Sequence, residues 1–182
     1  MKYKKLWTDM HSNIHHDQME ALPLWYEQIK KEMDFWPIAY YPFYMRPTSS
    51  GLAVEDRYED ELIEKDWEQV RQLALQAEKE GFPMFMGYEW QGAGLDGDHS
   101  VFFLENGEKQ EHPMRYQELV EAYKGKPVIG IPHHVAYQLG SRGKNWETHD
   151  EKFSPFAEIY SSHGCSENDD GPLMMNRHVH MG

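Results

Sequence analysis

Short apolar segments alternate with helix-forming segments along most of the chain, and this alternation restricts the folds open to it. Helices are predicted at 21–33, 55–80 and 115–125, and the longest of them, 55–80, carries an apolar stripe at helical spacing before Gly81 ends it. Pro37 marks the segment 34–43 as an irregular or edge strand. Further strands are predicted at the start of LWTDMHS (6–12) and at 82–90, 99–104, 126–134 and 156–164. This order of elements predicts an α/β fold with a mostly parallel sheet.

The composition limits the class of protein. A length of 182 residues with 40% apolar content suits one globular domain. A formal net charge of −13 argues against nucleic acid or an anionic membrane as the main partner. No apolar run approaches the roughly 18 residues of a membrane span, and the N-terminus lacks an apolar signal core, so we expect a cytoplasmic protein. The single cysteine, Cys165, excludes an internal disulfide and a Cys-rich zinc site.

The segment from Val135 to Ser154 is a long polar connection, longer than compact domains usually contain without a purpose. We predict a lid or a substrate loop in this region. Arg142 and Lys144 within it could pair with a substrate phosphate, and the alternative is that both are ordinary surface charges.

Most predicted strands begin or end at a side chain that can bind a metal ion. The C-terminal ends of parallel strands meet at one edge of a sheet, where α/β folds place their chemistry. Carboxylates suit hard ions and imidazoles suit borderline ions such as Zn²⁺, so a mixed set suits two or three ions held close together. The side chains concerned are Asp9, His11, Glu89, His99, His133, His134 and His163.

A structural interpretation competes with the metal site at each position. Asp9 could cap a turn, and His15, His16 and Asp17 could form the solvated start of a helix. Glu89 is harder to explain in this way, because a carboxylate at the end of an apolar run is costly to bury without a cation. The metal site is therefore inferred from the recurrence at several strand ends rather than from one residue.

Five short motifs together resemble those of the PHP superfamily, named for polymerase and histidinol phosphatase domains, and in particular an uncharacterised branch of it. TDMHSNIHHD (8–17) is similar to the family's opening motif H-x-H-T-x-x-S-x-D, with aspartate in place of the first histidine. GYEW, DHSVFFL, IPHH and EIYSSHGCSE resemble later segments that supply metal ligands. Carried over onto this chain, the resemblance implies a metal site of Asp9, His11, Asp17, Glu89, His99, His133 and His163, holding one to three divalent ions (Zn, Mn or Fe).

The resemblance also implies a fold, a distorted barrel of seven β/α units. With about six predicted strands, the chain is expected to form a distorted or incomplete (β/α)7 barrel, either because it is C-terminally incomplete or because the barrel is open. The family's second motif usually ends in Asp-His, where this chain has Tyr41 and Pro42, and a closing Asp-x-His is absent. His178 and His180 could substitute for the missing ligands, and an exposed strand edge could be covered by a second copy of the chain.

The function that follows from these motifs is metal-dependent hydrolysis of a phosphate ester by a metal-activated water. In this scheme His134 or His163 protonates the leaving group, and Arg142 binds the substrate phosphate. Two alternatives remain open. One is an amidohydrolase-like enzyme that cleaves a C–N or C–O bond, and the other is a catalytically silent binding module.

Overall fold

The computed structural model describes residues 3–51, 53–92, 94–135, 137, 140, 142–161 and 163–167. His178 and His180 lie outside these residues. The chain divides into two compact units: unit 1 comprises the residues up to Tyr88 together with Phe102–Glu108, and unit 2 comprises Glu89–Val101 and the residues from Lys109 onward.

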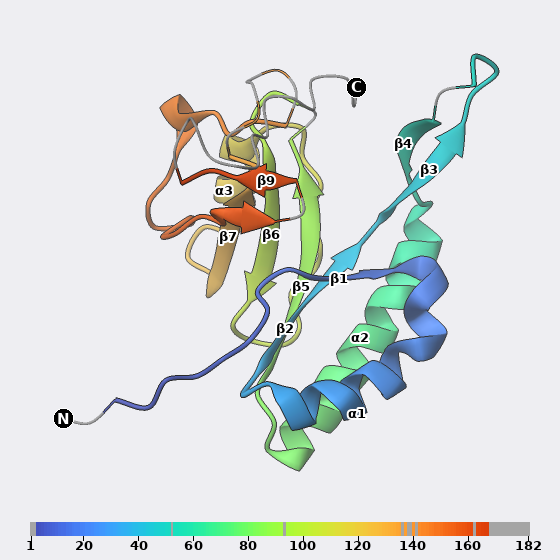
Figure 1. Cartoon of the computed structure of the whole chain (residues 1–182), viewed down its shortest axis with the longest axis vertical. Helices are drawn as coiled ribbons and strands as arrows, with labels where there is room; N and C mark the ends of the chain where they lie inside the picture. The colour runs from blue at the N-terminus through green and yellow to red at the C-terminus, as the bar shows by residue number, and fades with distance from the viewer. Residues whose placement is uncertain are drawn as a thin grey trace. The chain divides into compact units, whose positions relative to one another are not determined.

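The three predicted helices are present (Figure 1), and the strands differ more from expectation. The α-helices are α1 (Leu22–Glu32), α2 (Asp60–Glu80) and α3 (Tyr116–Ala122), with short 3₁₀ helices at η1 (His16–Ala21) and η2 (Trp146–Thr148). The strands are β1 (Ser12–His15), β2 (Trp36–Tyr41), β3 (Phe43–Pro47), β4 (Ala53–Arg57), β5 (Met84–Gln91), β6 (Asp98–Phe103), β7 (Val128–His133), β8 (Tyr160–Ser161) and β9 (Gly164–Cys165). None of the helices in the described ranges combines the length and the apolar content needed to cross a membrane.

The predicted (β/α)7 barrel with mostly parallel strands is wrong. The largest sheet has five strands in the order β1-β2-β5-β6-β7, so it ends in two edge strands and does not close. Strands β1, β2 and β5 pair in parallel, whereas β3–β4 and β8–β9 form separate antiparallel ribbons. Residues 92–97 alone join β5 to β6, and a parallel crossover needs about a dozen residues or more, so the five-stranded sheet is mixed.

Several strand predictions are wrong. In place of the predicted strand 156–164 the chain forms the two-residue strands β8 and β9, which pair antiparallel with each other. The first strand begins at Ser12 rather than Leu6, because Asp9 Oδ1 accepts the His11 backbone N–H at 2.8 Å and forms a turn before it. Strand β2 lies between β1 and β5 despite Pro37, with Trp36 and Tyr40 fully buried, so it is not an edge strand. The β3–β4 ribbon was not predicted, because its residues are largely exposed and lack an apolar pattern. Residues 55–57 of β4 were assigned to the predicted helix 55–80, which instead begins at Asp60.

Unit 1 is organised around α2. The helix ends at Gly81, whose left-handed φ of 75° provides the usual helix stop. Near this end Glu80 accepts hydrogen bonds from Tyr26 and Lys30 of α1, which joins the two helices (Figure 1). Near the other end, the buried Asp66 carboxylate accepts a hydrogen bond from the Tyr40 hydroxyl at 2.8 Å and lies 2.7 Å from His16 Nδ1.

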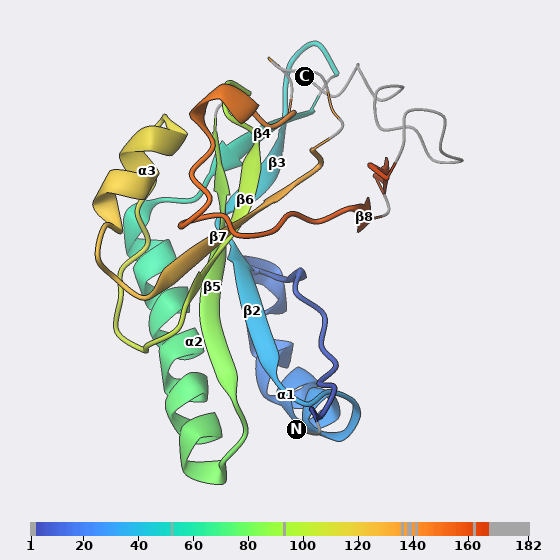
Figure 2. The same ribbon diagram turned by 90° about the vertical axis from the view of Figure 1, so that its left-hand side faces the viewer.

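In unit 2, Phe153 and Ser154 contact both β7 and the α3 segment (Figure 2). The Gly130 N–H donates to the Phe153 carbonyl at 2.8 Å, and the Phe153 ring covers Gly130 so closely that a Cβ there would lie 2.3 Å from Cε1. The same ring contacts Tyr116 and Tyr123 of the α3 segment. Glycine at 130 is therefore required by packing rather than by backbone conformation.

We expect Gly130→Ala to reduce the free energy of unfolding by about 2 kcal/mol, because the new methyl group overpacks against the Phe153 ring. Chemical denaturation measures the change. In a Phe153→Leu background the same substitution should cost clearly less, since the two residues are in contact. Equal costs in both backgrounds would show that the ring does not set the requirement.

Candidate metal centre

The site described below lies within unit 2, which contains Glu89, His99, His133, His134, Arg142 and His163. Asp9, His11 and Asp17 belong to unit 1. Asp9 caps the turn before β1, and Asp17 is exposed in the first turn of η1, as the structural interpretation of these two residues expects. His11 lies between the Asp9 turn and β1.

Two successive histidines at the end of β7 form the centre of the site. His133 is the last residue of the strand, and His134 adopts a left-handed backbone with φ of 57°. Consecutive side chains of an extended strand point to opposite faces, but this turn brings the two rings together, with their centroids 4.6 Å apart. Positive φ in a residue other than glycine is strained, and such strain concentrates at functional sites.

Two carboxylates lie beside these imidazoles. Asp98 offers an oxygen, and His133 and His134 each offer a nitrogen, all within 4.8 Å of one another. Glu89 Oε1 is 3.5 Å from His133 Nε2. All four side chains are at least 96% buried, with exposed fractions of 3% for Glu89 and Asp98, 1% for His133 and 4% for His134. Burying two carboxylates in this way is costly unless cations or hydrogen bonds compensate them.

The donor set fits a divalent ion. Two imidazoles with one or two carboxylates form the ligand chemistry of Zn²⁺ and of the other borderline ions. Burial, followed by the neighbouring His133 and His163, lowers the pKa of His134 to about 2. The His134 imidazole is therefore neutral at physiological pH, which is the state that binds a metal. Asp98, His133 and His134 would hold such an ion, with Glu89 adjacent through His133.

His163 and Arg142 border this cluster. The His163 ring lies 4.1 Å from the His134 ring, centroid to centroid, and its Nδ1 hydrogen-bonds the Tyr137 hydroxyl at 3.0 Å. Arg142 Nε is 3.4 Å from Asp98 Oδ2, which places one guanidinium beside the carboxylates. The structure thus brings together Glu89, His133, His134, Arg142 and His163 of the predicted set.

His99 occupies a different place. Along β6, Asp98 and Ser100 face His133, whose Nδ1 is 3.5 Å from Ser100 Oγ, whereas His99 points to the opposite face. There its ring stacks on Tyr116 at 4.8 Å and meets the edge of Trp90. Burial, and then the charge of Lys144, hold the pKa of His99 well below its ordinary value. His99 thus lies away from His133 and His134. Asp98, which the sequence analysis did not select, is the β6 residue that lies beside them.

Lys144 is buried rather than available to a substrate. Its Nζ lies 3.3 Å from the centroid of the Tyr116 ring and has no hydrogen-bond partner among the described residues. Burial lowers the pKa of Lys144 from 10.5 to about 8, against the opposing effect of Asp96. Of the two cations predicted to bind phosphate, only Arg142 reaches the cluster.

Comparison of the chain with protein-family models, curated proteins and solved structures finds no match. Function therefore has to be inferred from the chemistry of the site itself.

We expect Zn²⁺ to raise the melting temperature of the wild-type protein by several degrees at about 100 times its dissociation constant, because the ion binds only the folded site. His133→Gln should abolish most of this shift, and a chelator should reverse it. The matched control is His112→Gln, which changes a histidine that contacts Gln110 elsewhere in unit 2. Equal shifts in both variants would place the ion outside the cluster.

Lys144→Met should increase the free energy of unfolding at pH 7 by about 1 kcal/mol, because it removes a buried charge at the expense of a cation–π contact. Below pH 8 the wild-type amine is protonated in the folded and unfolded states, and the full cost of burying the charge is present. Between pH 8 and 10.5 only the unfolded state retains the proton, so wild-type stability rises with pH and the advantage of the variant shrinks.

Denaturation curves at pH 7 and pH 9.5 measure this difference. Lys124→Met, at an exposed lysine of the α3 segment that pairs with Glu121, serves as the control and should show no such pH dependence. An advantage of Lys144→Met that stays constant with pH would contradict the assignment.

Proposed function

We propose that the chain is a metal-dependent hydrolase of the PHP-like type, acting on phosphate esters. The observation that carries the proposal is the buried group of Asp98, His133 and His134, with ligand atoms within 4.8 Å of one another and a guanidinium beside it. The motif resemblance to the PHP superfamily supports the same reaction class, whereas the barrel of that superfamily forms no part of the proposal.

A bound divalent ion would supply a water of lowered pKa and a positive charge for the phosphoryl oxygens. The residues of the chain would provide the rest. Asp98, His133 and His134 would hold the ion, and Arg142 would bind a phosphate oxygen. Glu89, whose Oε1 lies 3.5 Å from His133 Nε2, would help to orient His133. His163, whose Nδ1 hydrogen-bonds the Tyr137 hydroxyl, would donate a proton to the leaving group.

Cleavage of a C–N or C–O bond is the second candidate. The burial of Lys144 on Tyr116 favours it. Of the two cations predicted to bind phosphate, Arg142 and Lys144, only Arg142 lies beside Asp98. A neutral amide or lactone needs no strongly cationic pocket. A panel of aryl phosphate, amide and lactone substrates, each assayed with Zn²⁺ and with Mn²⁺, separates the two reactions.

We expect the purified protein to hydrolyse para-nitrophenyl phosphate only when Zn²⁺ or Mn²⁺ is present, and His133→Gln to lower kcat/KM by roughly a hundredfold or more, since it removes a ligand. His112→Gln should retain wild-type activity. Metal-independent hydrolysis, or equal rates in the two variants, would overturn the proposal. Turnover of the amide or lactone alone would select the second candidate.

A further inference from the structure

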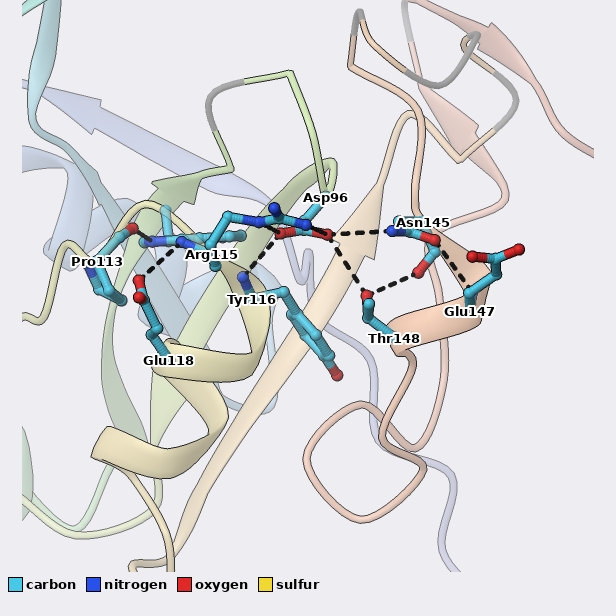
Figure 3. Close-up of polar contacts among 9 residues, drawn as sticks. Asp96, Pro113, Arg115, Tyr116, Glu118, Asn145, Glu147 and Thr148 are labelled. Carbon is cyan, nitrogen blue, oxygen red and sulfur yellow. Dashed lines mark hydrogen bonds and ion pairs between the residues drawn. The ribbon is translucent and has the colours of Figure 1, made fainter.

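The Asp96 carboxylate joins two segments that lie far apart in the sequence (Figure 3). It is 1% exposed. On one side Arg115 Nε donates to Oδ2 at 2.8 Å and Nη2 to Oδ1 at 3.3 Å, and the Tyr116 backbone N–H donates to Oδ2 at 3.0 Å. On the other side Asn145 Nδ2 and Thr148 Oγ1 each donate to Oδ1 at 3.4 Å.

The Asp96 carboxylate is held most closely on the α3 side. Its shortest contacts are the 2.8 Å bond from Arg115 Nε and the 3.0 Å bond from the Tyr116 backbone N–H, both to Oδ2. Oδ1 accepts from Arg115 Nη2 as well as from Asn145 and Thr148, so the same carboxylate contacts both segments.

The segment carrying Asn145 and Thr148 is the one in which the sequence predicts a lid. Close packing fixes it at a second point, since a Cβ on Gly97 would lie 2.9 Å from the Lys144 Cα and 3.1 Å from the Arg142 carbonyl oxygen. Farther along, the Asp150 N–H donates to the Tyr116 hydroxyl at 3.3 Å. Residues 142–150 thus contact Asp96, Gly97 and Tyr116. At the start of this segment, Arg142 Nε lies 3.4 Å from Asp98 Oδ2.

We propose that Asp96 is a positioning residue. By anchoring residues 142–150 it holds the Arg142 guanidinium beside the candidate ligand Asp98, and so it sets the affinity of the site for anionic substrates. This inference rests on the proposed function. Asp96 itself contacts neither the candidate ligands nor the substrate, and it acts through Arg142.

The test is a double-mutant cycle with Asp96→Asn and Arg142→Gln, read by the kinetics of para-nitrophenyl phosphate hydrolysis. Asp96→Asn should raise KM about tenfold while kcat changes less than about twofold, because binding of the phosphate is lost rather than the metal chemistry. In the Arg142→Gln background the same change should alter KM by less than about twofold, because the guanidinium that Asp96 positions is already absent. Additive effects on KM, or a fall in kcat alone, would overturn the proposal.

Hydrogen–deuterium exchange of the metal-free protein gives a readout independent of activity. Amides of residues 142–150 should lose protection in Asp96→Asn and keep it in the control Asp56→Asn, which removes a carboxylate paired with Arg46 in unit 1. Unchanged protection in Asp96→Asn would overturn the proposal whatever the kinetics show.

If the wild type hydrolyses nothing, the proposed function fails, and calorimetric binding of inorganic phosphate replaces KM in the same cycle. Absence of phosphate binding would then overturn this inference as well.

A milder substitution covers the case in which Asp96→Asn does not fold. Thr148→Val removes one hydroxyl, which lies 3.4 Å from Asp96 Oδ1 and 3.2 Å from the Asn145 carbonyl oxygen, and leaves the Arg115 and Tyr116 contacts intact. It should raise KM in the same direction by a smaller factor, and Thr148→Ser, which keeps the hydroxyl, should restore the wild-type value. Identical KM values for all three proteins would contradict the proposal.

Discussion

The burial of the Glu89 and Asp98 carboxylates beside the imidazoles of His133 and His134 is the constraint on which the site depends. Carboxylates so far from solvent raise the free energy of the folded state unless positive charge compensates them. Arg142 provides some of this charge, at 3.4 Å from Asp98. A divalent ion held by Asp98, His133 and His134 would add positive charge at the same place, and binding it would account for the strained backbone at His134.

Unit 2 also contains a second set of interactions, which involves none of Asp98, His133 and His134. Asp96 ties the start of α3 to residues 145 and 148, and Tyr116 links His99, Lys144 and Ser154. Supporting contacts of this kind determine how accurately the reactive groups are placed. The two sets of interactions lie on opposite faces of β6. Asp98 faces His133 on one side, and His99 faces Tyr116 on the other.

The sequence predicts part of this arrangement and not the rest. Helical spacing located α1, α2 and α3, and the position of Gly81 located the end of α2, because these signals are local. The sequence singled out Glu89, His133 and His134 as metal-binding candidates, and these three side chains lie beside one another. The choice between Asp98 and His99 depends on which face of β6 meets β7 and which meets α3, and neighbouring positions in a strand carry no such information. The burial of Lys144 likewise depends on a tertiary contact with Tyr116. The mostly parallel sheet predicted from the order of elements is wrong because the 92–97 connection is too short for a parallel crossover and because β3–β4 and β8–β9 form antiparallel ribbons.

The most direct test of the metal centre is an anomalous-difference map from crystals of the Zn²⁺-loaded protein, recorded at the zinc absorption edge. A peak at about 2.0–2.2 Å from an Asp98 oxygen and from nitrogens of His133 and His134 is the predicted result. A map with its strongest zinc peak elsewhere in the protein, or with none among these side chains, would contradict the central claim.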